Sequence, residues 1–480
     1  MKKNKISAIP LGIRSAVVFL FATLFSRGLA IITTPIFTRL MTTEEIGEVN
    51  LFSSWYSMLG VIATLSLTSG GFTIALKEFK EERNQYVSSV LSLTSLIAIL
   101  FSIVYFIKPS FWNNVTGLSS KLMLLMLFGF FVAPARDFWL SRQRYEYKYK
   151  LPGIITICSA IIASALSIFV VIKMNGAKSQ HIAEGRLFAN YIIVFGVALA
   201  IWIATMGRGK TFFNKRYWSF SLKLSLPLVG YSIASQVLNT SDRLMIGKLV
   251  NNSAVGIYST LYTVSSLSIM VWSALNSSFE PYLYQNMENK QHRIREISLG
   301  MLGLYGVIAV MLVFCAPEIV RILATEEYYE AIYIMPPIAA GVFFTSVSNM
   351  YSNILVYLKK TKYIMISSVI AAILNVVLNA LFIPKLGYMA AAYTTLVSYI
   401  VMAGILMFCA YQEYRKRIGS LNKVYDNNKI IILSLGVVSA SLSGLLTYKF
   451  VILRYVSIIG MFAVGLILLK KFVANKKTMK

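Results

Sequence analysis

Charged residues are scarce in this chain. Only 14% of its 480 residues are Asp, Glu, Lys or Arg, whereas a soluble globular protein typically carries about 25%. Hydrophobic residues make up 57% of the chain, and the mean hydropathy is +0.67. This balance argues against an ordinary soluble enzyme and predicts an integral membrane protein.

Cysteine and histidine are also rare, which disfavours two common kinds of chemistry. Cys158, Cys315 and Cys409 lie in separate apolar stretches without CxxC spacing, so we interpret them as small packing residues. His181 and His292 are far apart in the sequence. We therefore predict no metal site and no catalytic residue, and we expect that the protein is not an enzyme.

Acidic residues are few, with 19 Asp and Glu against 46 Lys and Arg, which gives a net charge of +27. The basic residues occupy short loops between apolar runs. That pattern is typical of cytoplasmic loops that face anionic lipid, and it argues against nucleic acid as a partner. We find no good candidate for a carboxylate deep in an apolar run, which disfavours ion-coupled drug export. Coupling to H⁺ or Na⁺ is left open, and no other cofactor is expected.

The apolar residues form fourteen runs, each long enough to cross a bilayer as a helix of roughly 20 residues. The runs are continuous rather than alternating, which favours helices over strands. The predicted fold is an all-α integral membrane protein with fourteen transmembrane helices. The predicted spans are 11–34, 47–69, 86–107, 120–140, 151–173, 186–206, 222–247, 255–279, 295–316, 331–358, 362–383, 387–410, 429–448 and 452–473.

The distribution of positive charge supports this division. With the N-terminus placed inside, 33 of the 46 Lys and Arg residues fall in inside segments and 12 in outside loops. The remaining one, Arg27, lies within the first span. Because positive charge concentrates on the cytoplasmic side, we predict that both termini are cytoplasmic.

An internal repeat divides the chain. The segment Arg39–Gly47 aligns with Lys248–Gly256 at an offset of 209 residues, and six spans separate the two. An even number of crossings gives two parallel repeats, as in transporters with two rocking lobes. We expect an N-terminal lobe at 1–206, a cytoplasmic linker at 207–221, a C-terminal lobe at 222–410, and two further helices with a basic tail at 411–480.

Several spans carry polar stripes on one helical face. Gln236, Asn239 and Arg243 follow one another at steps of three and four in the span 222–247, and Asn349 and Asn353 repeat that spacing in the span 331–358. One interpretation is contact between helices through hydrogen bonds. The other is a hydrated cavity whose neutral donors and acceptors suit a hydroxyl-rich cargo.

Two charged positions are candidates for recognition of the cargo. Arg27 lies well inside an apolar span, where an arginine costs at least ~2.5 kcal/mol. It would either bind an anion, such as a phosphate or an acidic sugar, or have a structural partner such as Asp242 or helix carbonyls. Asp242 and Arg243 stand where their span ends, and we favour a local ion pair or a helix-end charge there.

Two segments resemble a known family. Ser241–Lys248 with Ala254–Ser259, and also Thr33–Gly47, are similar to the corresponding turns of Wzx-type polysaccharide flippases, which belong to the superfamily of multidrug, oligosaccharidyl-lipid and polysaccharide (MOP) exporters. The resemblance implies a MATE-like fold of two six-helix lobes plus two C-terminal helices. It also implies transfer of an undecaprenyl-pyrophosphate-linked oligosaccharide across a bacterial inner membrane, for O-antigen, lipopolysaccharide or capsule synthesis. The expected partners are this lipid-linked cargo, membrane lipid, and a polysaccharide polymerase with its chain-length regulator.

These observations favour a flippase that works by alternating access. The predicted substrate-binding residues are Arg27, Gln236, Asn239, Asp242, Arg243, Asn349 and Asn353. A drug or cation exporter of MATE-like fold is the first alternative. A membrane polysaccharide polymerase or glycosyltransferase is the second, although such an enzyme would need a larger loop or domain than this chain offers.

Overall fold

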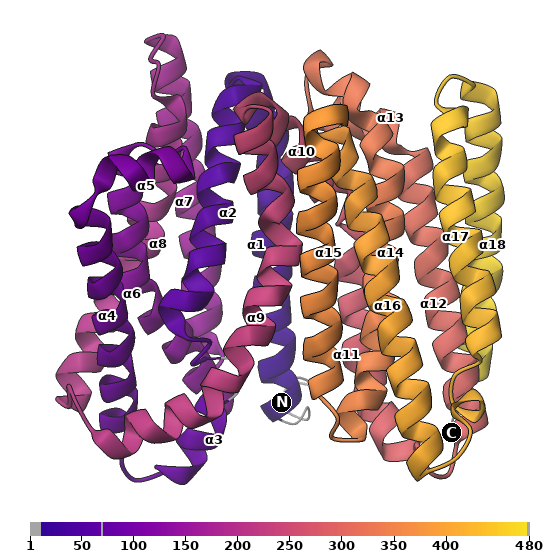
Figure 1. The fold of residues 1–480 in the computed structure, drawn as a ribbon, viewed down its shortest axis with the longest axis horizontal. Helices are drawn as coiled ribbons and strands as arrows, with labels where there is room; N and C mark the ends of the chain where they lie inside the picture. Colours follow the sequence, from indigo (N-terminus) through magenta and orange to yellow (C-terminus); the bar gives the residue numbers. More distant parts are fainter. Residues whose placement is uncertain (1–10, 69–70, 478–480) are drawn as a thin grey trace, which may run out of the picture. The chain divides into compact units, whose positions relative to one another are not determined.

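The computed structural model describes residues 11–68 and 71–477, and within these ranges the chain is helical with no strand. It divides into two compact units, residues 1–236 and 237–480. The first unit contains α1 (Leu11–Leu40), α2 (Thr43–Thr64), α3 (Gly71–Glu78), α4 (Arg83–Ile107), α5 (Pro109–Thr116), α6 (Ser120–Tyr145), α7 (Lys150–Gly176), α8 (Ile182–Gly209) and the start of α9 (Lys215–Leu249) (Figure 1).

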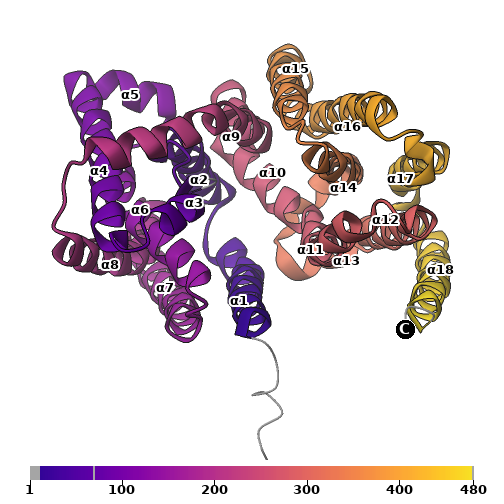
Figure 2. The ribbon, with the colours of Figure 1, turned by 90° about the horizontal axis from the view of Figure 1, so that it is seen from below.

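The second unit begins inside α9. Its further helices are α10 (Asn252–Ser265), α11 (Ser268–Asn286), α12 (Gln291–Phe314), α13 (Ala316–Leu323), η2 (Glu326–Ile334), α14 (Met335–Tyr357), α15 (Lys362–Leu386), α16 (Met389–Arg417), η3 (Leu421–Lys423), α17 (Asn427–Thr447) and α18 (Val451–Lys477). Most side chains of α14 are buried, since this helix packs against α11, α12, α16 and α17. Figure 2, which looks along the helices, shows α14 among these neighbours.

Eleven helical stretches of the described chain are long and apolar enough to cross a membrane. They overlap all the predicted spans except 47–69, 222–247 and 452–473, where the structure has α2, α9 and α18. Residue 69, the predicted end of the first of these three, lies outside the described residues. Polar side chains lower the mean hydropathy of α2 and α9, and the apolar part of α18 is shorter. The all-α membrane fold is confirmed, whereas the number of fourteen crossings stays a prediction.

The offset of 209 residues also relates the helix boundaries of the two units. Helices α1 and α9 end at Leu40 and Leu249, and α2 and α10 begin two residues after Met41 and Val250. The side chain of Thr42 caps α2 by accepting a hydrogen bond from the backbone N–H of Glu45 at 3.2 Å, and Asn251 caps α10 in the same way through Ala254 at 2.8 Å. Both residues are preferred N-caps, so two different sequences specify the same turn.

Helix α9 begins as part of the first unit. The Tyr217 hydroxyl donates to a carboxylate oxygen of Glu82 at 2.5 Å, and the Trp218 indole donates to the Ser89 carbonyl at 2.8 Å. Helices α8 and α9 leave only residues 210–214 between them, so most of the segment predicted as a linker is helical. Pro227 lies within α9, where it removes one backbone donor and favours a bend.

Candidate functional site

A buried carboxylate lies in the second unit. Asp242 is only 2% exposed, and its side chain accepts three hydrogen bonds. These come from the Tyr258 hydroxyl at 2.7 Å, the Asn379 amide at 2.8 Å and the Thr395 hydroxyl at 2.7 Å. The donors stand on α10, α15 and α16, so one acidic residue of α9 ties four helices together. A buried charged group is costly unless such partners satisfy it.

The hydrogen bonds continue beyond Asp242. The Asn379 amide also donates to Asn375 Oδ1 at 3.1 Å, and Asn375 accepts a second bond from the Ser241 hydroxyl at 2.7 Å. The Asn375 amide in turn donates to Thr395 Oγ1 at 3.2 Å, and the Thr394 hydroxyl donates to Asn379. All these side chains are buried. We call this set of residues the Asp242 network: Ser241, Asp242, Tyr258, Asn375, Asn379, Thr394 and Thr395.

The Asp242 network is built from oxygen-bearing and amide side chains inside an otherwise apolar bundle. Carboxylate, amide and hydroxyl oxygens are the ligands that hard cations prefer. A proton can also be held on such a carboxylate, because hydroxyl and amide groups can rearrange their hydrogen bonds around it. The arrangement can therefore respond to a small cation, which an apolar helix contact cannot do.

Two expectations about this region are wrong. The sequence suggested that the spans hold no buried carboxylate and that Asp242 forms a local pair with Arg243. Asp242 instead points into the bundle, while Arg243 donates to the Asn239 carbonyl at 2.8 Å and lies 4.5 Å from the ring centre of Tyr262. Adjacent residues on a helix point in different directions, which separates the two charges.

The other predicted site residues fall into separate places. Asn239 accepts a hydrogen bond from the Tyr399 hydroxyl at 3.2 Å, and with Arg243 it lies beside the Asp242 network. Gln236 lies about one turn earlier on α9 and is half-buried. Asn353 is buried on α14 and donates to Asn276 of α11 at 3.0 Å, a contact between helices. Asn349 is exposed on α14.

Arg27 lies on α1 in the first unit, and its side chain is exposed. It makes no hydrogen bond or ion pair with any residue that the structure describes. Asp242 already accepts three hydrogen bonds within its own unit. The described residues offer Arg27 no partner within its own unit, and recognition of an anion by this residue stays a prediction.

A hollow of about 790 Å³ opens between α3 and α6 of the first unit. Hydroxyl groups, aromatic rings and two arginines meet in it. Its lining residues are Thr68, Thr73, Arg83, Ser141, Arg144, Tyr145, Glu146 and Tyr147. We call it the α3–α6 hollow. Its volume lies within the range of about 300–1,000 Å³ that small-molecule sites occupy.

The two arginines of the α3–α6 hollow differ in how firmly protein contacts hold their side chains. Arg83 donates to the Leu76 carbonyl at 2.8 Å and stacks 5.1 Å from the ring centre of Tyr145. Arg144 is exposed and lies 5.1 Å from the ring centre of Phe19. Hydroxyls and aromatic faces suit sugar rings, and a guanidinium matches phosphate. This hollow could not be predicted from the sequence, because no residue spacing shows that α3 packs against α6.

Comparison with known proteins agrees with this fold. The profile of the family described as "Polysaccharide biosynthesis protein" matches residues 13–287, and the MatE family profile matches residues 227–381. The chain is 23% identical over 399 residues to the probable low-salt glycan biosynthesis flippase Agl15 of Haloferax volcanii, covering 81% of each protein.

Solved structures with a similar fold include two kinds of transporter. The lipid II flippase MurJ, in an inward closed conformation, has a TM-score of 0.65 at 16% identity, covering 94% of this chain and 100% of that one. An inward-facing multidrug resistance MATE family transporter of the MOP superfamily has a TM-score of 0.59 at 12% identity, covering 81% of this chain and 95% of the other. The resemblance to the MOP superfamily noted in the sequence is confirmed. Because a single family profile matches more than half of its length, the chain belongs to the polysaccharide biosynthesis protein family.

Proposed function

We propose that this protein is a flippase that moves a lipid-linked oligosaccharide between the leaflets of a membrane. The observation that carries the proposal is the family match over residues 13–287, in a chain made almost entirely of membrane-length helices. The similarity to a flippase named for glycan biosynthesis supports the same cargo class. In this proposal the protein carries out transport and no catalysis.

The finer proposal follows the expectations from the sequence. The cargo is an undecaprenyl-pyrophosphate-linked repeat unit for O-antigen or capsule synthesis, and the membrane is a bacterial inner membrane with both chain termini in the cytoplasm. A polysaccharide polymerase and a chain-length regulator would act on the product. In alternating access, the binding site opens first to one side of the membrane and then to the other. The glycan head would move through the protein in this way, while the lipid tail stays in the bilayer.

In this proposal, Arg27 and the α3–α6 hollow bind the glycan head group. Arg27 provides a cation without a protein partner, which suits the phosphate or an acidic sugar. The α3–α6 hollow offers hydroxyls and tyrosines for sugar rings and Arg144 for a negative group. Both features belong to the first unit. We propose that they contact the glycan head group when it enters from the side rich in basic loops.

We further propose that the Asp242 network couples transport to H⁺ or Na⁺. Asp242 is buried and accepts hydrogen bonds from side chains of three other helices. It lies beside Arg243 and Asn239 on the same helix. Binding of a cation would pull the oxygens of Asp242 and its neighbours together and change the packing of α9 against α15 and α16. A two-state change of this kind can be driven by an ion gradient, because the ion binds one arrangement better than the other.

A drug or cation exporter is a second candidate. The MatE profile matches residues 227–381, and a buried carboxylate such as Asp242 is what ion-coupled export requires. Deletion of the gene separates the candidates. A flippase predicts accumulation of a complete lipid-linked repeat unit on the cytoplasmic face, with normal drug tolerance. Drug hypersensitivity with normal surface polysaccharide would favour the exporter, and failure to assemble the unit would favour an enzyme.

A further inference from the structure

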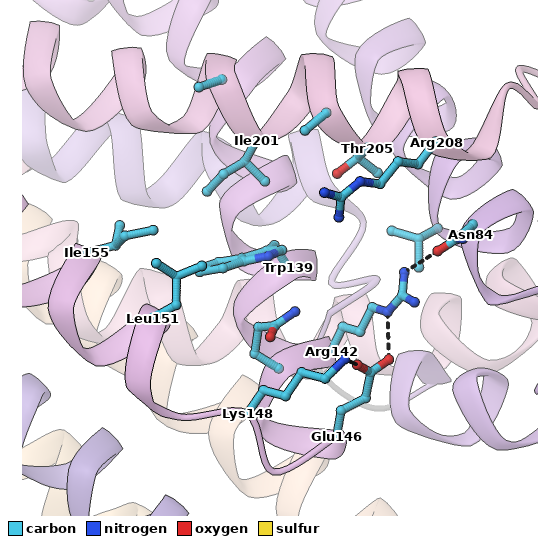
Figure 3. A pocket seen from close by; sticks show the side chains of 14 residues that line it. Asn84, Trp139, Arg142, Glu146, Lys148, Leu151, Ile155, Ile201, Thr205 and Arg208 are labelled. Atoms are coloured by element: carbon cyan, nitrogen blue, oxygen red, sulfur yellow. Dashed lines mark hydrogen bonds and ion pairs between the residues drawn. The ribbon is translucent and has the colours of Figure 1, made fainter.

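A second cavity, of about 330 Å³, lies in the first unit, where α6 and α8 end and α4 and α7 begin. We call it the α4–α8 pocket. Figure 3 shows its two different ends: Leu151, Ile155 and Ile201 form an apolar end, and Arg142, Glu146 and Arg208 form a charged end. Trp139 lies between the two.

The charged end has more positive than negative groups. Arg142, Lys148 and Arg208 surround one carboxylate, Glu146. Glu146 accepts hydrogen bonds from Arg142 at 2.8 Å and from Lys148 at 2.6 Å, and Arg83 approaches to 4.0 Å from outside the pocket. The single carboxylate is thus already neutralised, and the pocket keeps an excess of positive charge that would attract an anion.

Arg208 is the cation without a partner. Among the described residues it forms no hydrogen bond and no ion pair, and Figure 3 shows its guanidinium directed toward the same space as that of Arg142. Arg142 is fixed by a hydrogen bond to Asn84 Oδ1 at 2.7 Å. One guanidinium is therefore positioned and one is available, an arrangement suited to bidentate binding of a phosphate.

A close contact between helices fixes the backbone next to Arg208. Gly209 follows it at the end of α8, and a Cβ atom on that glycine would lie 2.2 Å from the Asn84 carbonyl oxygen and 2.3 Å from Ser88 Cβ. Only glycine allows α8 to approach the start of α4 so closely. The end of α8 that carries Arg208 is therefore held against α4 by backbone packing.

The apolar end opens toward a surface that suits lipid chains. Leu151, Ile154 and Ile203 are each 59% exposed next to it, and Ala200 and Ala204 of its lining are also exposed. Large exposed aliphatic side chains of this kind on a membrane helix face hydrocarbon. The pocket thus joins an apolar opening to a cationic interior, which is the complement of an amphiphile with a negative head.

We propose that the α4–α8 pocket binds an anionic phospholipid of the leaflet next to the basic loops, with its phosphodiester against Arg208 and Arg142 and its first acyl carbons along Trp139 and Ile201. Basic pockets between membrane helices on the cytoplasmic side bind anionic head groups. A volume of about 330 Å³ admits a phosphodiester head but leaves no room for an oligosaccharide. The occupant is therefore a resident lipid rather than the cargo. This inference rests on the membrane topology of the proposed function.

Lipid binding to the purified, delipidated full-length protein tests the proposal. The protein in detergent is titrated with phosphatidylglycerol or phosphatidylcholine, and bound lipid is counted by native mass spectrometry. We expect selective binding of phosphatidylglycerol, with an apparent Kd about tenfold weaker in Arg208→Gln and partly restored in Arg208→Lys. Arg415→Gln is the matched control, because Arg415 is also an exposed arginine in the last turn of a membrane helix. It should change the Kd less than about twofold.

A variant without charge change separates the pocket from general surface attraction. Ala204→Trp should fill the exposed apolar opening and weaken phosphatidylglycerol binding as much as Arg208→Gln does. Equal binding of the two lipids, or equal effects of Arg208→Gln and Arg415→Gln, would overturn the proposal. Displacement of the lipid by millimolar glycerol phosphate would also overturn it, in favour of a soluble phosphate. The assay contains no glycan, so its outcome is independent of whether the protein flips one.

Discussion

The side-chain amide of Asn379 on α15 donates a hydrogen bond of 2.8 Å to Oδ1 of Asp242 on α9. These two residues are 137 positions apart in the sequence, and both are at most 2% exposed. Their contact links a charge to a neutral amide inside an apolar bundle. In the proposed coupling, this contact would make α9, the helix that also carries Asn239 and Arg243, respond to a cation bound at Asp242.

The most specific consequence concerns Asp242 itself. Asp242→Asn keeps the shape of the side chain but removes its charge, so we expect ion-driven transport to fall at least about tenfold while the protein level is maintained. Initial flipping rates in proteoliposomes, with and without an imposed H⁺ or Na⁺ gradient, measure this. Glu288→Gln is the control, since Glu288 is an exposed acid of the same unit. Unchanged gradient dependence in Asp242→Asn would exclude the coupling role.

Removing the acceptor altogether should affect the fold. Asp242→Leu leaves the donors of Tyr258, Asn379 and Thr395 without their acceptor, and each unsatisfied buried group costs about 1–3 kcal/mol. We expect a clearly lower Tm of the purified protein in detergent than for Asp242→Asn. Equal Tm values for the two variants would mean that these hydrogen bonds contribute little.

Arg27 is exposed and contacts no charged partner among the described residues, so its loss should impair recognition of the cargo and not folding. We expect Arg27→Ala to lower surface polysaccharide without lowering the protein level, and Arg27→Lys to retain part of it because the charge remains. Staining of surface polysaccharide and immunoblotting measure the two quantities. Arg321→Ala, at an exposed arginine of the second unit, is the control. Normal polysaccharide in Arg27→Ala would reject the role.

The α3–α6 hollow makes a prediction about affinity. Arg144 is its more exposed arginine, and a charge-assisted hydrogen bond contributes about 1.5–3 kcal/mol. Arg144→Gln should therefore raise the KM for the lipid-linked glycan about tenfold or more, with a smaller effect on kcat. Flipping rates over a range of cargo concentrations give both values. Lys80→Gln, an exposed cation outside the hollow, should leave KM unchanged; a fall in kcat alone for Arg144→Gln would place this arginine outside the binding step.

The ionisation of Glu146 should make the stability of the protein depend on pH. Burial opposes its charge, but hydrogen bonds from Arg142 and Lys148 outweigh this and lower its pKa below the usual 4.5. A carboxyl with a lowered pKa stabilises the folded state above its unfolded pKa, and that contribution is lost as the pH falls through the folded pKa. We expect Glu146→Gln to reduce stability by about 1 kcal/mol at pH 7, and the difference should shrink as the pH falls below 4.5 and disappear once the pH is below the lowered pKa of Glu146.

The Tm of both proteins measured from pH 7 down to about pH 3 checks this. Glu44→Gln is the control, because Glu44 is exposed. A difference in Tm between Glu146→Gln and the unmodified protein that stays constant over this whole range would show that Glu146 acts through packing instead of charge.

The sequence predicted those features that depend on local patterns. Long apolar runs predicted the helices, and the repeated turn follows from an offset of 209 residues that is read directly from the sequence. That Thr42 and Asn251 cap the helices after this turn comes from the structure. Asp242 was named as a candidate, but its burial and its hydrogen-bond partners could not be predicted, because Tyr258, Asn379 and Thr395 lie on three other helices and each is unremarkable alone. The signal that could have found them is the pair Asn375 and Asn379, one helical turn apart in an apolar span.

The two cavities of the first unit could not be predicted for a similar reason. Arg83, Arg144 and Arg208 were counted only as loop charges, which fixes the side of the membrane but not the neighbours of each side chain. The α3–α6 hollow depends on a short helix, Gly71–Glu78, that no apolar run predicted. The α4–α8 pocket depends on the close approach of Gly209 to Asn84, and that approach is visible only in three dimensions.

The central claim is that this protein moves a lipid-linked glycan across a membrane. The most direct measurement is the leaflet distribution of a fluorescent undecaprenyl-pyrophosphate oligosaccharide in proteoliposomes, read from the fraction that a membrane-impermeant quencher reaches over time. The account predicts rapid transfer with the intact protein and slow transfer with Arg27→Ala. Transfer no faster than in protein-free liposomes, under either ion gradient, would contradict it.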